Sequence, residues 1–169
     1  MGLKGGYCNV NGFEHALGRT KRAISLVGEY LPATRSAGDK SMTANILVDL
    51  SGYLVATDDL TGAVAAAREA IEMFMALQAD HVGIRIAIES LALVSALRGR
   101  LADAAKLEGF VEVAFGRLGF ERDFTESATR GELAAVLRAG LSVDGTSRLS
   151  AEGAGLALDD AVTLALERA

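Results

Sequence analysis

Apolar residues recur along the chain at the three- and four-residue spacings of an amphipathic helix. Between residues 41 and 57 they follow the i, i+1, i+4, i+7, i+8 pattern, which places them on one helix face. These positions are Ile46, Leu47, Leu50, Tyr53 and Leu54. Residues 83–98 repeat the pattern 41 positions later, with Ala87, Ile88, Leu91, Val94 and Ser95. Because a half-buried strand has a period of two, the pattern predicts two amphipathic helices rather than strands.

Three further helices each follow a short polar turn. The small residues Ala23, Ala63 and Ala104 correspond in these segments, at offsets of 40 and 41 residues. The ends of the same helices recur about 41 and 40 residues apart, at Gly38-Asp39, Ala79-Asp80 and Gly119-Phe120. A single helix pair cannot bury its own apolar face, whereas stacked pairs share a continuous core. The sequence therefore predicts an all-α fold of antiparallel helix-pair repeats, a tetratricopeptide-like (TPR-like) α-solenoid with a period of about 40–41 residues. Chance similarity among Ala-rich helices is the alternative.

The chain as a whole, residues 1–169, is expected to form one domain. We divide it into a flexible Gly-rich N-terminus (1–12), the repeats (13–120) and a C-terminal helical cap (121–169). The first long helix is expected over residues 19–36, with a stunted partner within 7–17. This half-pair is either a degenerate cap or the point where preceding repeats are missing. Pro32 should kink the long helix or end it near Tyr30.

The cap begins with one more amphipathic helix, predicted over residues 122–141. Residues 142–155 are rich in glycine, which predicts a loop or a weak helix. A short helix is expected from Asp159 to Arg168, with its acids in the first turn, where the helix dipole favours negative charge.

Composition supports the helical prediction and narrows the partners. Ala, Leu and Val dominate, and proline occurs once. The net charge of −5 divides into +3 over residues 1–41 and −8 over 42–169, and the basic cluster is limited to Arg19, Lys21 and Arg22. Nucleic-acid binding usually needs a larger basic patch, so we expect no direct nucleic-acid partner.

The single cysteine, Cys8, excludes an intrachain disulfide. No apolar run reaches the roughly 18 residues of a membrane span, and no signal peptide is seen, so we expect a cytoplasmic protein without membrane contact.

Two segments carry a family resemblance. The segment from Ala104 to Gly119 reads Ala-Ala-Lys-Leu-Glu-Gly-Phe-Val-Glu-Val-Ala-Phe-Gly-Arg-Leu-Gly and resembles an Ala-Ala-x-Leu-x-Gly-Ala-x-x-Ala-x-x-x-x-Leu-Gly signature. The segment from Ala151 to Val162 resembles a Glu-Gly, alternating-Leu, paired-acid motif. Both look like the C-terminal TPR-like helical-repeat region of bacterial transcription regulators and predicted signalling ATPases. Two features depart from the family: Ala157 stands where a Ser or Thr cap is frequent, and residues 143–147 weaken the helix before the Glu-Gly.

The resemblance implies a regulatory protein in which a nucleotide-binding module precedes the repeats and a DNA-binding domain lies at one end. Those modules are not in these residues, so their activities do not transfer. The sequence offers no catalytic set of its own. Residues 38–41 end in Lys-Ser but lack the glycine spacing of a phosphate loop. His15 and His81 lie in no metal or nucleophile motif. The acidic pair Glu108 and Glu112 fits a solvated helix face. We expect no enzyme activity, no metal and no cofactor.

The first helix of each TPR-like pair lines a concave groove, which makes this groove the candidate binding site. Its positions are Asn45, Val48, Gly52, Val55 and Ala56 in one unit and Ile86, Glu89, Leu93, Ala96 and Leu97 in the next. A large apolar surface usually marks an interface. We expect it to be covered by a protein partner or neighbouring regulator domain, by a second copy of the chain in a homodimer, or by the chain's own C-terminal part.

An alternative function is small-molecule (inducer) sensing in the same groove. Asn45, Tyr53, Arg85 and Glu89 would then orient a ligand on an otherwise apolar wall.

Overall fold

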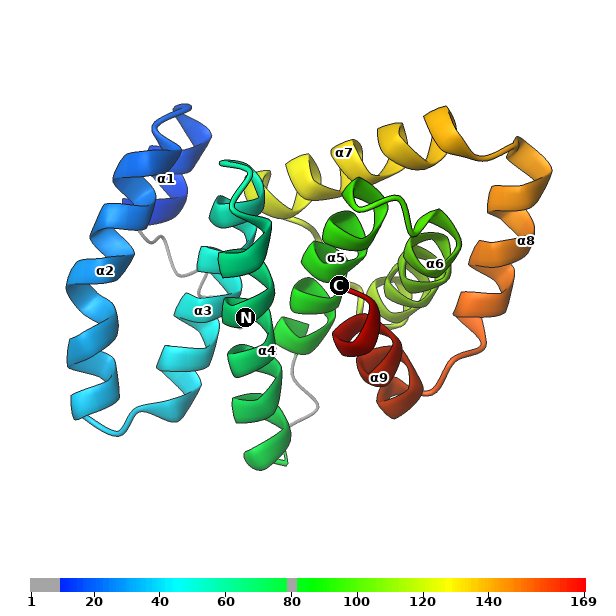
Figure 1. Ribbon diagram of the computed structural model, residues 1–169. Coiled ribbons are helices and arrows are strands. Elements are labelled where there is room, and N and C mark those ends of the chain that lie inside the picture. Colours follow the sequence, from blue (N-terminus) through cyan, green and yellow to red (C-terminus); the bar gives the residue numbers. More distant parts are fainter. Residues whose placement is uncertain (1–9, 79–81) are drawn as a thin grey trace.

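The computed structural model describes residues 10–78 and 82–169, and within these residues the protein consists of helices without strands. The all-α prediction is confirmed. Figure 1 shows the helices, which follow one another through short connections. Their bounds are α1 Val10–Ala16, α2 Thr20–Ser36, α3 Lys40–Val55, α4 Leu60–Ala76, α5 Val82–Leu97, α6 Leu101–Leu118, α7 Phe124–Gly140, α8 Val143–Ala154 and α9 Leu158–Arg168.

The turns between helices repeat one backbone geometry. Gly18, Asp58 and Gly99 each have a positive φ, of 76°, 64° and 82°, and each precedes the N-cap of α2, α4 or α6. A second set, Gly38, Gln78 and Gly119, has φ values of 70°, 52° and 60°. Both sets are spaced by 40 and 41 residues. Most residues other than glycine are strained at a positive φ. The recurrence of such residues at one spacing therefore shows that the connections between helices share one backbone geometry.

Small residues lie where the helices pack most closely. Ala23, Ala63 and Ala104 are each the fourth residue of their helix, and all three are buried. Ala23 packs with Val27 and Tyr53 in a small cluster between α2 and α3. The main core runs from α3 and α4 through α5 and α6 to α7 and α9. Each of the first six helices packs against its neighbours in sequence, and α7 crosses α5 and α3 (Figure 1).

Proline 32 does not end α2, which continues to Ser36, so the prediction of an end near Tyr30 is wrong. Proline lacks the N–H that would bond the carbonyl four residues earlier, and its ring crowds that position. The residue there is Gly28, which is exposed and carries no side chain. Water can therefore hydrate the unpaired carbonyl, and this lowers the cost of the proline.

Residues 143–154 form a regular helix, α8, where the glycines had predicted a loop or weak helix. Ser142 caps it, because its Oγ accepts from the Gly145 N–H at 3.1 Å. Gly153 and Gly109 allow the backbones of α8 and α6 to touch. A Cβ atom on Gly153 would lie 1.8 Å from the Lys106 carbonyl oxygen, and one on Gly109 would lie 2.0 Å from that of Ser150. The glycines thus serve a close helix crossing and do not break the helix.

The N-terminal predictions are met in part. Residues 10–12, expected in the flexible stretch, belong to α1, the stunted helix foreseen within 7–17. Cys8, the Ala79-Asp80 helix end and His81 lie outside the described residues. Among the described residues, no helix is long and apolar enough to cross a membrane.

Candidate functional site

The residues proposed for the groove and for its ligand do not form an open surface. Val48, Tyr53, Val55, Arg85, Glu89 and Leu93 are buried, Asn45 and Ile86 are half-buried, and Leu97 is 40 % exposed. The chain covers most of this face itself. Of the three coverings considered from the sequence, the structure shows the internal one, supplied by α7.

The four polar residues proposed to orient a ligand face different neighbours. Asn45 donates to the Ser41 carbonyl oxygen of its own helix. Tyr53 packs toward α1 and α2, with its ring 5.0 Å from that of His15. Arg85 lines a cavity beside α6, while Glu89 lies beneath α7. The structure therefore does not bring these four residues together at one ligand.

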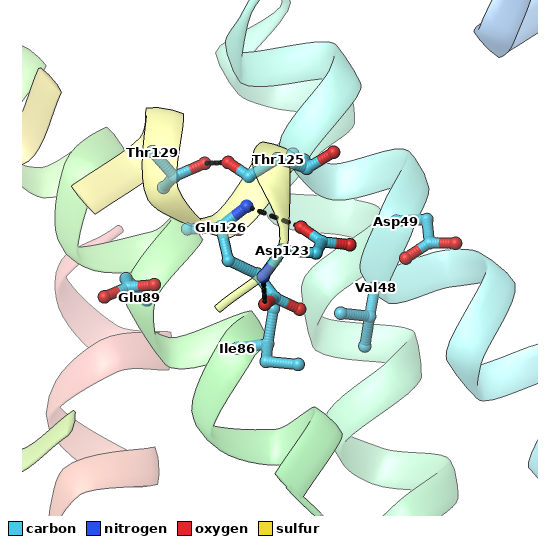
Figure 2. Close-up of a pocket in the computed structure, with 10 residues that line it drawn as sticks. Val48, Asp49, Ile86, Glu89, Asp123, Thr125, Glu126 and Thr129 are labelled. Carbon is cyan, nitrogen blue, oxygen red and sulfur yellow. Dashed lines mark hydrogen bonds between the residues drawn. The ribbon is translucent and has the colours of Figure 1, made fainter. Parts of the chain in front are cut away.

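The first turns of α7 close the groove. Thr125, Glu126 and Thr129 of α7 line a small cavity together with α3 and α5 (Figure 2). The cavity holds about 10 Å³, room for about one water molecule. Gly52 permits the approach, because a Cβ on it would lie 3.1 Å from Thr125 Cγ2. A small-molecule ligand of ordinary size does not fit here.

The start of α7 is fixed by a capping box. Asp123 accepts from the Glu126 N–H at 3.0 Å, and Glu126 accepts in return from the Asp123 N–H at 2.8 Å (Figure 2). Each bond satisfies a backbone donor that the helix end leaves open. The pattern Asp-x-x-Glu before an apolar run is the sequence signal that could have located this helix start.

Four carboxylates line the small cavity: Asp49, Glu89, Asp123 and Glu126. Burial raises the pKa of Glu126 to about 7, and the negative charges of Asp123, Glu89 and Asp49 act in the same direction. The hydrogen bond from the Asp123 backbone opposes the shift. The Glu126 side chain is consequently part protonated near neutral pH, which an acid exposed to water would not be.

An ion-pair network joins the segment just before α7 to α5 and α6. Arg122 Nη2 lies 2.7 Å from Glu89 Oε1 and 2.5 Å from Glu112 Oε1, and its guanidinium stacks 4.5 Å from the Phe115 ring centroid. Arg130 on α7 adds a second bond to Glu112, at 2.7 Å. Glu89 is 1 % exposed, so its charge depends on these partners.

The two carboxyls respond in opposite directions. Burial raises the pKa of Glu89 by more than the hydrogen bond and charge of Arg122 lower it. Burial also acts to raise the pKa of Glu112, but Arg130 and Arg122 together lower it below its usual range. Glu112 is thus no solvated surface acid, contrary to the sequence expectation. Its neighbour Glu108 is also engaged, because Ser150 Oγ donates to it at 2.7 Å.

The arrangement is suited to holding helices together. His15 lies between Tyr53 and Phe124, with Nδ1 3.0 Å from Thr20 Oγ1, and burial lowers its pKa despite the opposing charge of Asp123. Within residues 10–78 and 82–169, no group of three or more His, Cys, Asp or Glu is placed to hold a metal ion.

A larger cavity lies on another side of the molecule, between α5, α6 and the start of α9. We call it the α6–α9 cavity, and it measures about 360 Å³. Its lining residues are Arg85, Phe110, Val113, Ala114, Arg117, Leu118, Ala154, Leu156, Ala157 and Leu158. Among the proposed site residues, Arg85 alone lines it. No pattern in the sequence predicted this cavity.

An apolar surface is also exposed at the α1 end of the molecule. Val10 and Phe13 on α1, and Leu17 directly after it, are 58 %, 57 % and 64 % exposed. Phe124, at the first position of α7, is 56 % exposed, and its ring lies 5.9 Å from that of His15 in α1. We call these four residues the end surface.

Comparisons with known proteins found no matching family model, no matching curated protein and no matching solved structure.

Proposed function

We propose that this chain is a non-enzymatic, TPR-like helical-repeat domain with a role in protein–protein interaction and regulation. The repeat is supported by the left-handed residues and helix starts that recur every 40 and 41 residues. The relation to the C-terminal part of bacterial transcription regulators and predicted signalling ATPases rests on the two motif segments alone. A cytoplasmic location is part of the same proposal.

The end surface carries the interaction function. Three large apolar side chains on a short helix and directly after it, each more than half exposed, are unusual on a surface that meets water alone. Phe124 extends the patch onto α7. The groove is an unsuitable docking site, because α7 already fills it and Leu133 and Leu137 of α7 are part of the core. We therefore place the partner on the end surface.

The first experiment compares oligomeric state in three proteins by light scattering over a dilution series. They are the wild type, a Phe13→Ser, Leu17→Ser variant of the end surface, and a Val143→Ser control. Val143 is 82 % exposed and lies on α8. If the wild type and the control dimerise and the end-surface variant does not, the partner is a second copy of the chain.

A monomeric wild type calls for a second readout. A photo-crosslinking residue at position 13 should then capture a specific protein in cells, while the same residue at position 143 should not. If position 13 captures nothing, or if both positions capture the same proteins, the end surface is not an interaction site.

Small-molecule sensing remains as a second proposed function, supported by the volume of the α6–α9 cavity. A cavity of about 360 Å³ falls in the range of small-ligand sites, whereas the closed groove does not. A sensing function would therefore use a different place from the groove expected from the sequence.

A further inference from the structure

The α6–α9 cavity results from the way α8 crosses α6. Gly109 and Gly153 bring the two backbones together at one point. The chain then leaves α8 at Gly155, and α9 returns to pack on α5 and α6 (Figure 1). The space between the crossing and α9 is lined by the C-terminal half of α6 on one side and by residues 154–158 on the other.

Most of the residues that line this cavity are apolar, although polar atoms make up about half of its exposed surface. Phe110 is buried at its base, and Leu156 and Leu158 are half-buried on the side of α9. Leu118 is half exposed at the end of α6. A ligand with an aliphatic or aromatic body would remove this apolar surface from water, which favours binding in proportion to the area covered.

The charges that line the cavity have one sign. Arg85 comes from α5 and is 8 % exposed, while Arg117 comes from the last turn of α6. Among the described residues that line it, none is acidic. Asp159 and Asp160, in the first turn of α9, are exposed and are not among the lining residues. Arg85 already has an interaction within the chain, so Arg117 supplies the positive charge with which a ligand can pair, and that charge favours an anion.

The guanidinium of Arg117 is available for a ligand. It makes no hydrogen bond or ion pair with any residue that the structure describes, although other arginines of the chain, such as Arg122 and Arg130, are paired. The start of α9 adds backbone donors nearby. Its N-cap is Ala157, which gives no side-chain acceptor to the first N–H groups of the helix, and Ala157 and Leu158 both line the cavity.

We propose that the α6–α9 cavity binds a small organic carboxylate with an apolar body. The carboxylate pairs with Arg117, since a guanidinium can bind both carboxylate oxygens at once. It lies in the part of the cavity that Arg85 also lines. The apolar body lies against Phe110, Leu156 and Leu158. This inference gives the sensing function its ligand class, and it is independent of the interaction proposed for the end surface.

The test is a calorimetric titration of the full chain with octanoate. Two further probes separate the contributions: acetate has the charge without the apolar body, and octanamide has the body without the charge. Octanoate should bind saturably and raise the melting temperature. Acetate and octanamide should each bind at least roughly tenfold more weakly, because each lacks one of the two interactions.

A matched pair of variants locates the site. Arg117→Gln should weaken octanoate binding by roughly tenfold. Arg138→Gln removes one exposed positive charge from α7, which does not line the cavity, and should leave binding unchanged. Both arginines are exposed, so both variants should keep the wild-type helicity.

A third variant tests the volume. Ala114→Phe fills the cavity from α6 and should abolish octanoate binding while the circular dichroism spectrum stays helical. The proposal is overturned if octanoate shows no saturable binding, if octanamide binds as tightly, or if Arg117→Gln and Arg138→Gln have the same effect. None of these results would bear on the end surface, whose own variants lie on α1.

Discussion

Arg122 Nη2 lies 2.7 Å from Oε1 of Glu89, a carboxylate that is 1 % exposed and 33 residues away in the sequence. The contact joins the segment just before α7 to the centre of α5. Burying both charges is costly, and the pair is stable because Glu112 and the Phe115 ring also contact the guanidinium. The pair therefore fixes where α7 lies more than it adds net stability.

Removing one partner of this pair should be more damaging than removing both. Arg122→Leu leaves Glu89 buried without its cation, and we expect a loss of about 3–5 kcal/mol in the free energy of unfolding. The Glu89→Leu, Arg122→Leu double variant should recover much of this loss, because no charge is then left unpaired. Urea unfolding measures both. A double variant as unstable as the single one would contradict the buried-pair interpretation.

Glu126 should make the stability of the protein fall between about pH 4.5 and pH 7. Its folded-state pKa of about 7 lies above its ordinary value of 4.5, so the folded protein binds a proton between these values that the unfolded chain releases. The stability that this bound proton provides is lost as pH rises from about 4.5 through 7. Glu126→Gln keeps the capping box and removes the charge, since glutamine serves equally at that position.

The expected pH profile for Glu126→Gln is specific. At pH 8.5 the variant should exceed the wild type in unfolding free energy by roughly 1 to 3 kcal/mol, the lower end allowing for partial exposure. The difference should shrink as pH falls from 7 and vanish below about pH 4.5. Glu132→Gln, on an exposed face of the same helix, should show little difference at any pH. A constant offset for Glu126→Gln across the range would exclude a titration effect.

The glycines of the α6–α8 crossing should not tolerate a methyl group. Gly153→Ala would place its Cβ against the Lys106 backbone, so α8 must move away from α6. We expect a loss of about 1–3 kcal/mol in stability. Gly131→Ala is the control, because nothing lies within 4 Å of its Cβ position in α7. That variant should gain roughly 0.5–1 kcal/mol, since alanine favours the helix. Equal effects for the two variants would mean that the crossing is loose.

Charge substitutions in the groove should unfold the protein. Val48→Asp and Leu93→Asp each bury an unpaired carboxylate in the core, so we expect loss of the cooperative thermal transition. Leu97→Asp, at a position 40 % exposed, should remain folded. Near-ultraviolet circular dichroism distinguishes the two. Well-folded Val48→Asp and Leu93→Asp proteins would show that the groove opens more readily than its burial indicates.

The parts of the fold that follow from local pattern could be predicted. The apolar spacing located α3 and α5, and the Ala23, Ala63 and Ala104 series located the starts of α2, α4 and α6. Gly153 contributed to the wrong prediction of a loop or weak helix, because a glycine indicates a helix breaker unless its neighbour in space is known. That neighbour, the backbone of Lys106, is 47 residues away, and no local signal links the two.

The site was harder to predict than the helices. Val48 and Leu93 are both buried, but which element covers them depends on where α7 lies. Arg122 is one charge among many in the sequence, and its importance comes from Glu89 and Glu112, which meet it only after folding. The α6–α9 cavity is likewise a property of the space left between packed helices, which no residue pattern announces.

The position of α7 changes how the molecule should come apart. In a plain stack each helix pair touches its neighbours alone, so the ends can fray while the middle stays folded. Here α7 contacts α1, α3, α5 and α6, and so braces both ends of the row against its centre. Amide protons in α1 and α6 should therefore exchange through one shared opening event, and the protein should melt as a single cooperative unit.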